Sequence, residues 1–210
     1  MSNRPNVLLL FSDEHRHDAM GCAGHERVKT PHLDALAENG TRFTQAFTPS
    51  PICVPARAAL ATGQYVHQNR CWSNAEAYSG DPVSWGHHLI EQGHRVDSIG
   101  KLHYRGGETH NGFEEEILPL YIRNGVGWIK GLLRDHEAFF DVSSYVREIG
   151  PGSDRYTDYD LGVTRAARQW LSDAGQAAPE KPWVLFVSWL RPHYPLTCPP
   201  EYYDLYPLDK

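Results

Sequence analysis

The sequence lacks any apolar run long enough to cross a membrane or to act as an export signal. Its first apolar run, Val7 to Phe11, is short, whereas a membrane-spanning helix needs about 20 apolar residues. The four cysteines also lack the spacing of a disulfide framework or a zinc finger. We therefore expect a cytoplasmic protein with reduced thiols and no membrane partner.

An excess of positive charge is also missing. The chain has 20 lysines and arginines against 26 acidic residues, a net charge of -6, which argues against nucleic acid or an anionic membrane as a partner. No internal repeat or low-complexity tract is visible. The 210 residues, 40% of them hydrophobic, suffice for one large domain or two small ones.

Apolar runs alternate with helical patterns along the chain. Apolar segments predict buried strands at Val7 to Phe11 and Trp183 to Leu190. Val96 to Ile99 is predicted as a further strand, ending at Gly100, and a looser alternation predicts another at Thr41 to Phe47. Helices are expected after Thr30, from Ser84 to Gln92 and from Thr157 onward. This order predicts an α/β fold whose central sheet is largely parallel and flanked by helices.

One long segment fits neither pattern. Residues from about 106 to 152 are rich in glycine and aromatic side chains and show little periodicity. We predict an irregular insertion or lid there.

The segment from Pro51 to Gly63 predicts a short helix with reactive residues at its start. Pro55 suits the first turn of a helix, and Gly63 suits the left-handed position just past its end. Cys53 then lies at the N-terminus, where free N–H groups attract an anion, and Arg57 lies on the same helical face. On these residues alone, a structural cysteine followed by a surface arginine remains an alternative.

Three further segments place polar side chains at predicted strand ends. Asp13 and Glu14 follow the first strand and offer oxygen ligands for a divalent cation, although an acidic turn would look the same. Lys101 and His103 follow the strand at residues 96–99, and alternation would let both face one site if the segment is extended. His193 follows the strand at residues 183–190. Such strand ends are where open α/β sheets bind ligands.

Together these segments resemble the type I sulfatases of the alkaline-phosphatase superfamily. Cys53-Val54-Pro55-Ala56-Arg57 resembles the family's Cys-x-Pro-x-Arg signature, Gly100-Lys101-Leu102-His103 its Gly-Lys-x-His, and Pro192-His193-Tyr194-Pro195 its Pro-His-x-Pro. The Asn6-Val7 strand leading to Asp13 resembles the family's start, from which Glu14 departs. The resemblance implies an alkaline-phosphatase-like sandwich.

The resemblance also implies a reaction. Cys53 would be converted to formylglycine by a formylglycine-generating enzyme, and the hydrate would attack a small-molecule sulfate ester. The implied catalytic residues are Cys53, Arg57, Lys101, His103 and His193. Substrate would be held by Lys101, His193 and Asn74, although Asn74 is equally consistent with a plain turn. The resemblance also implies a divalent metal, with calcium as first choice and magnesium or manganese as alternatives. Asp13, Glu14 and the modified Cys53 would bind it.

The resemblance covers only part of the family's pattern. Sulfatases carry further metal ligands, an aspartate followed by histidine or asparagine, and another lysine in a C-terminal part that this chain lacks. Asp135-His136 has the matching residue types, but it precedes the Pro-His motif and lacks the expected neighbouring glycine. We therefore expect residues 1–210 to be the N-terminal portion of one sulfatase catalytic domain. Two alternatives stay open: a phosphonate or phosphate mono- or diester hydrolase on the same scaffold, and an inactive truncated anion-binding module.

Overall fold

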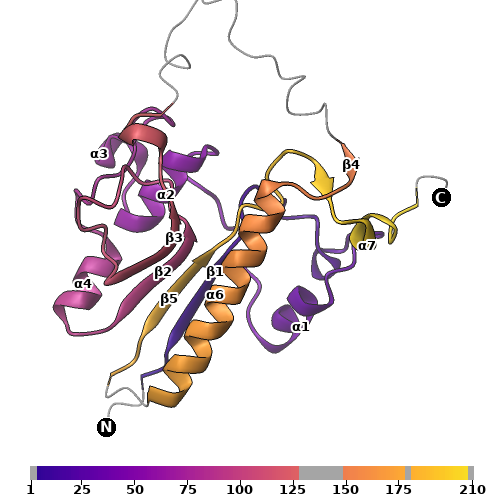
Figure 1. The fold of residues 1–210 in the computed structure, drawn as a ribbon, viewed down its shortest axis with the longest axis horizontal. Helices are drawn as coiled ribbons and strands as arrows, with labels where there is room; N and C mark the ends of the chain where they lie inside the picture. Colours follow the sequence, from indigo (N-terminus) through magenta and orange to yellow (C-terminus); the bar gives the residue numbers. More distant parts are fainter. Residues whose placement is uncertain (1–3, 128–148, 178–180, 208–210) are drawn as a thin grey trace, which may run out of the picture.

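A parallel four-stranded sheet forms the centre of the molecule (Figure 1). The computed structural model describes residues 4–127, 149–177 and 181–207. In spatial order, the strands are β1 (Val7–Phe11), β5 (Val184–Ser188), β2 (Val96–Lys101) and β3 (Glu115–Leu120). β5 and β2 are buried throughout their length. Burial on both faces explains the continuous apolar sequence of β5.

Helices cover both faces of this sheet, as Figure 1 shows. The long helix α6 (Arg155–Ala177) packs Val163 and Trp170 against Leu185 and Val187 of β5. On the opposite face, α2 (Cys53–Thr62) and α4 (Trp85–Glu91) pack against the sheet, with Val54 and Ala58 in the same cluster as Phe186. The result is the α/β sandwich that the sequence predicts.

The remaining elements are short. They are η1 (Gly21–Ala23), α1 (Pro31–Asn39), α3 (Val66–Asn69), η2 (Arg123–Gly125), β4 (Gly150–Pro151), β6 (Thr197–Cys198) and α7 (Pro200–Tyr203). β4 and β6 pair with each other as a separate two-stranded sheet. Across the described ranges, no helix combines the length and apolar composition needed to cross a bilayer.

Most predicted elements are confirmed. β1, β2 and β5 match the predicted strands in position, and α1, α4 and α6 match the predicted helices. The predicted burial of β1 is wrong, because Leu8 and Leu10 are 41% and 51% exposed at the edge of the sheet. α2 begins at Cys53 itself, so Pro55 lies in its first turn, and Gly63 ends it with a φ of 67°. Glycine tolerates this left-handed conformation because it has no Cβ.

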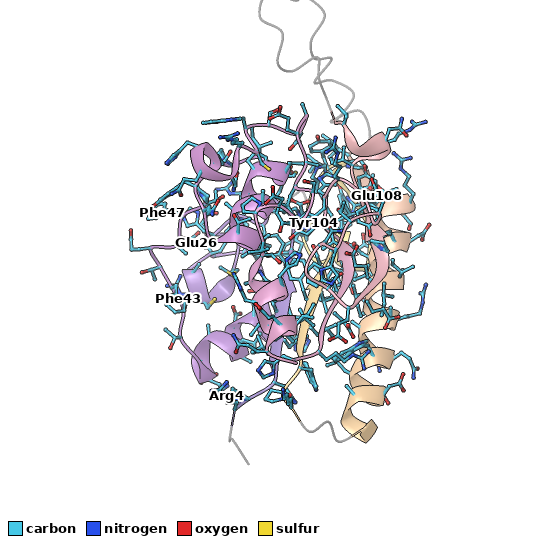
Figure 2. All side chains as sticks on the ribbon, turned by 90° about the vertical axis from the view of Figure 1, so that its left-hand side faces the viewer. Arg4, Glu26, Phe43, Phe47, Tyr104 and Glu108 are labelled. Carbon is cyan, nitrogen blue, oxygen red and sulfur yellow. The ribbon has the colours of Figure 1, made fainter. Side chains whose placement is uncertain are left out.

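The predicted strand at Thr41 to Phe47 is wrong. The backbone there forms a turn and irregular chain, and every residue from 41 to 47 is exposed. Figure 2 shows Phe43 and Phe47 at the periphery of the molecule, where they are 79% and 84% exposed. Alternating residues form a strand only where a neighbouring strand pairs with them, and none of the described strands does so here.

The expectation of irregular structure from about 106 to 152 is also partly wrong. Residues Glu115–Leu120 form β3, which pairs in parallel with β2, and Gly150–Pro151 form β4. Residues 128–148 lie outside the described ranges, and so do Asp135 and His136. The prediction of a lid is therefore untested.

Candidate active site

Three neighbouring strands bring polar side chains to one edge of the sheet. Lys101 is the last residue of β2, Ser188 is the last residue of β5, and Asp13 follows the end of β1 by two residues. Because the three strands are parallel and adjacent in the order β1-β5-β2, these side chains meet at the carboxyl edge.

The N-terminus of α2 reaches the same edge. Cys53 is the first residue of this helix, and its Sγ lies 4.0 Å from Asp13 Oδ1 and 3.8 Å from Lys101 Nζ. Asn74 Oδ1 accepts a hydrogen bond from the backbone N–H of Val54 at 3.0 Å, which satisfies one of the free donors of the first turn. The predicted contact of Asn74 with substrate is untested, but its side chain does lie at the site.

Arg57 ties the helix to the strands. Its Nη1 donates to the Lys101 carbonyl at 2.6 Å and to Ser188 Oγ at 3.0 Å, while its guanidinium carbon lies 5.0 Å from the ring centre of Phe11. Lys101 Nζ donates to Asp13 Oδ2, and Arg57 Nη2 lies 3.6 Å from the same oxygen. The alternative of a surface arginine is therefore wrong, because Arg57 is only 3% exposed.

This cluster holds more positive than negative charge. Lys101 is 1% exposed and Asp13 7%, so two buried cations share one carboxylate. Arg57 Nη2 is also buried without a hydrogen-bond partner among the described residues. Buried donors of this kind are rarely left unpaired. The excess of buried cations over buried carboxylates, with a donor that lacks a hydrogen bond, favours an anion beside Cys53.

The same environment sets the ionisation of Asp13 and Cys53. Burial alone would raise the pKa of Asp13, but the charges of Lys101 and Arg57, with the hydrogen bond from Lys101, outweigh it and lower the pKa. For Cys53, burial raises the pKa of the thiol; Lys101 opposes this and the Asp13 carboxylate adds to it. Asp13 is thus a carboxylate and Cys53, as a cysteine, a thiol at neutral pH.

His193 and Glu14 line the outer side of Cys53. His193 Nε2 lies 3.4 Å from Glu14 Oε1, and His193 Nδ1 lies 2.7 Å from the Tyr194 carbonyl oxygen. A carbonyl can only accept, so Nδ1 carries the proton and Nε2 faces the site. Ligand atoms of Glu14, Cys53 and His193 all lie within 4.8 Å of one another.

His103 reaches the site in a conformation that the sequence does not predict. Its φ is 54°, so the segment is not extended as the alternation with Lys101 assumes. Burial and the charges of Lys101 and Arg57 lower the pKa of His103 to about 3. Its Nδ1 is buried without a hydrogen-bond partner among the described residues.

The sequence did not reveal the residues that hold the His193 loop. Arg191 donates from Nη1 to the carbonyl of His193 at 3.1 Å and from Nη2 to Asp154 Oδ2 at 2.7 Å. The Asp160 carboxylate accepts the backbone N–H groups of Leu190 and Arg191, both at 2.8 Å. Arg191 stands beside the recognised His193, but Asp154 and Asp160 lie more than 30 residues upstream, where no local pattern marks them.

The donor set fits part of a hard-cation site. Asp13 and Glu14 supply two carboxylates at one strand end, whereas calcium takes about 6–8 oxygen ligands. The Lys101 ammonium also competes for Asp13 Oδ2. The described residues therefore contribute carboxylate ligands toward such a site without completing it.

Comparison with known proteins agrees with this geometry. The choline-sulfatase of Rhizobium meliloti (strain 1021) is 29% identical over 215 residues, which cover 98% of this chain and 41% of that protein. An ulvan-active sulfatase of Formosa agariphila is 38% identical over 148 residues, which cover 70% of this chain and 28% of the relative. This chain spans less than half the length of these relatives.

Solved structures show the same fold. The crystal structure of the phosphonate monoester hydrolase of Agrobacterium radiobacter matches with a TM-score of 0.66 and 24% identity, over 99% of this chain and 45% of that chain. The architecture is the alkaline-phosphatase-like one expected from the sequence. Residues 5–209 match the Sulfatase family, and with Cys53, Arg57, Lys101 and His193 gathered as its motifs predict, the chain belongs to that family.

Proposed function

We propose that this chain carries the reaction centre of a hydrolase that cleaves small-molecule sulfate esters into an alcohol or phenol and inorganic sulfate. The observation that carries the proposal is the cluster of buried charges beside Cys53. There, buried Lys101 and Arg57 outnumber the buried Asp13 carboxylate, and Arg57 Nη2, 3.6 Å from Asp13 Oδ2, makes no hydrogen bond to the described residues. A sulfate group, tetrahedral and anionic, supplies both the charge and the acceptor oxygens that such a cluster needs.

In this proposal Cys53 is oxidised by a formylglycine-generating enzyme. Formylglycine would supply, as its hydrate, one hydroxyl as nucleophile and a second whose deprotonation later releases sulfate. The N-terminus of α2 and the ammonium of Lys101, which lies 3.8 Å from Cys53 Sγ, would then hold the sulfate oxygens. Arg57 is fixed by Ser188 and the Lys101 carbonyl, so its free Nη2 is preorganised toward the same group.

The two histidines would handle protons on opposite sides of Cys53. His193 Nε2 faces the site, and as an imidazolium, with protons on both ring nitrogens, His193 would donate its Nε2 proton to the leaving alcohol oxygen. His103, with a pKa lowered to about 3, is neutral at pH 7, and its unpartnered Nδ1 makes it an acceptor for the proton of the second hydroxyl. A divalent cation bound by Asp13 and Glu14, with calcium as first choice, would neutralise charge on the sulfate oxygens.

The second candidate is a phosphonate or phosphate ester hydrolase. Lys101 and Arg57 bind oxyanions as charges and do not by themselves distinguish a sulfuryl from a phosphoryl group. Two phosphonate monoester hydrolase structures, each with a TM-score of 0.66, share the fold. We further propose a cytoplasmic location, which the four free cysteine thiols support.

One set of measurements separates these functions. The chain is produced with a formylglycine-generating enzyme, and the mass of the Cys53 peptide reports its conversion. Calcium-loaded protein is then assayed on a sulfate, a phosphate and a phosphonate ester of the same phenol, with Cys53→Ala as the inactive control. Preferred turnover of the sulfate supports the first proposal, and preferred turnover of a phosphoryl ester supports the second.

The remaining outcome points to an anion-binding module. A Cys53 that stays unconverted, with no turnover of any ester, contradicts both hydrolase proposals. Calorimetry with calcium and inorganic sulfate then tests binding alone. An Arg57→Met variant should weaken sulfate binding, because it removes the free Nη2 donor from the cluster.

A further inference from the structure

Cys53 exists as a thiol before any conversion, and in that state three electron-pair donors converge on one point. Glu14 follows β1, Cys53 begins α2 and His193 follows β5, so three separate elements each contribute a ligand atom. These atoms lie within 4.8 Å of one another. A thiolate, an imidazole nitrogen and a carboxylate oxygen are the ligand types of zinc sites that keep one position open.

The distances suit a tetrahedral ion. With zinc bonds of about 2.0–2.3 Å, neighbouring ligand atoms in a tetrahedron lie roughly 3.3–3.7 Å apart. The observed separation of 3.4 Å between His193 Nε2 and Glu14 Oε1 already matches such an edge. Cys53 Sγ needs to approach the other two by no more than about 1.5 Å, judged from the 4.8 Å limit.

His193 is oriented as a metal-binding histidine is. Its Nδ1–H donates to the Tyr194 carbonyl at 2.7 Å, which fixes the tautomer and directs the Nε2 lone pair toward Glu14 and Cys53. Arg191 holds the same loop by donating to the His193 carbonyl. The ligand is thus held in place without a metal, and Glu14, whose side chain is 45% exposed, leaves a route from solvent.

The charges also balance. The Glu14 carboxylate and a Cys53 thiolate together compensate a divalent ion, while Asp13 is already paired with Lys101. The displaced thiol proton passes to solvent when the metal binds. Water or an oxyanion would complete the coordination at the fourth position.

We infer that the unconverted chain binds zinc or a similar transition-metal ion through Glu14, Cys53 and His193. Sulfur and imidazole ligands select such ions over calcium and magnesium, which prefer oxygen. The site differs from the hard-cation site in its ligands, because it uses His193 and a sulfur atom and leaves out Asp13. The inference concerns the thiol form only and holds whether or not the proposed esterase activity is correct.

Cobalt titration tests the inference directly. The 210-residue chain with Cys53 as a thiol is titrated with Co²⁺. We expect one equivalent to produce a near-ultraviolet thiolate-to-cobalt band that zinc abolishes. Cys53→Ser should remove the band and weaken zinc binding at least about 100-fold, and Glu14→Gln and His193→Ala should weaken it by about 10–100-fold. Cys198→Ser is the matched control, since Cys198 is half-buried like Cys53.

A second measurement needs no variant and so does not depend on how each variant folds. Zinc should slow alkylation of Cys53, read from the mass of its peptide, while Cys22 and Cys198 react at unchanged rates. A cobalt band that survives in Cys53→Ser overturns the inference, and so does a chain that shows neither band nor protection. Zinc binding by the thiol form, together with no ester turnover by the converted chain, would leave the inference standing and reject only the proposed function.

Discussion

Burial among cations decides the protonation state of His103. Lys101, Arg57 and the low polarity of its surroundings all disfavour an imidazolium ion, and they lower the pKa of His103 to about 3. In the unfolded chain the same side chain titrates near 6.5. The difference couples this one residue to the stability of the whole protein.

The coupling predicts how stability falls in acid. Above about pH 6.5, His103 is neutral in both states; below it, the unfolded chain binds a proton that the folded protein excludes until the pH nears 3. His103 should therefore reduce the free energy of unfolding by up to ~1.4 kcal/mol for each pH unit lost in that window. Urea unfolding of His103→Gln between pH 6 and 4, roughly the middle of this range, should show a correspondingly smaller slope.

A control isolates this effect from the titration of other groups. His32 is exposed on α1, and His32→Gln should leave the pH slope as in the wild-type protein. If His103→Gln has the same slope as the wild-type protein, His103 is not the neutral buried residue described here.

At the scale of single residues, the sequence predicts positions better than conformations. The positions of Asp13 and Lys101 in the site are predictable because both residues lie at strand ends. The position of Cys53 is predictable because it begins a helix. The left-handed backbone at His103 has no sequence signal, because histidine rarely adopts a positive φ. Asp160, which holds the chain at the end of β5, looks like any acidic residue on a helix.

At the scale of elements, α2 depends on a side chain from outside the helix. Ile52 precedes it and offers no capping oxygen, so Asn74 Oδ1 accepts the N–H of Val54 in its place. Val54 is 1% exposed, and water cannot replace this bond. The position of Cys53 in the site therefore depends on Asn74.

Two substitutions of Asn74 should differ in their effect on the free energy of unfolding. Asn74→Ala leaves a buried N–H unpaired and should lower the free energy of unfolding by about 1–3 kcal/mol. Asn74→Asp keeps an acceptor of the same shape and adds negative charge at a helix N-terminus, so it should retain most of that stability. Urea unfolding at neutral pH measures both variants.

The same pair tests the role implied by family resemblance. If Asn74 also contacts the substrate, Asn74→Asp should bind sulfate less well than the wild-type protein, because the added carboxylate repels it. Equal loss of stability in both variants would contradict the capping role.

Element prediction succeeded where burial alone explains the pattern. β5 is marked by a continuous apolar run because helices cover both faces of the sheet at this strand. Thr41 to Phe47 alternates loosely, but none of the strands that the structure describes pairs with it, and pairing cannot be read from one segment. β3 was missed because its residues, Glu115 to Leu120, begin with two acidic side chains at the sheet edge and face solvent in part.

At the scale of the whole molecule, β1 is the least covered part of the sheet. It pairs with β5 on one side, and no described strand pairs with its other edge. Leu8 and Leu10 lie opposite Leu185 and Val187, on the face that α6 covers at β5, yet they are 41% and 51% exposed. An unpaired edge with exposed leucines is a site for association with other chains.

This edge predicts self-association of the chain in solution. Replacing Leu10 by lysine places a charge on the apolar surface of β1, so sedimentation over a range of concentrations should show Leu10→Lys shifted toward the monomer. Leu205→Lys is the matched control, because Leu205 is 52% exposed after α7 and adds the same charge away from the sheet. The Leu205→Lys variant should show the same degree of self-association as the wild-type protein at each concentration. A wild-type chain that stays monomeric, or equal association of both variants, would show that the β1 edge does not drive contacts between chains.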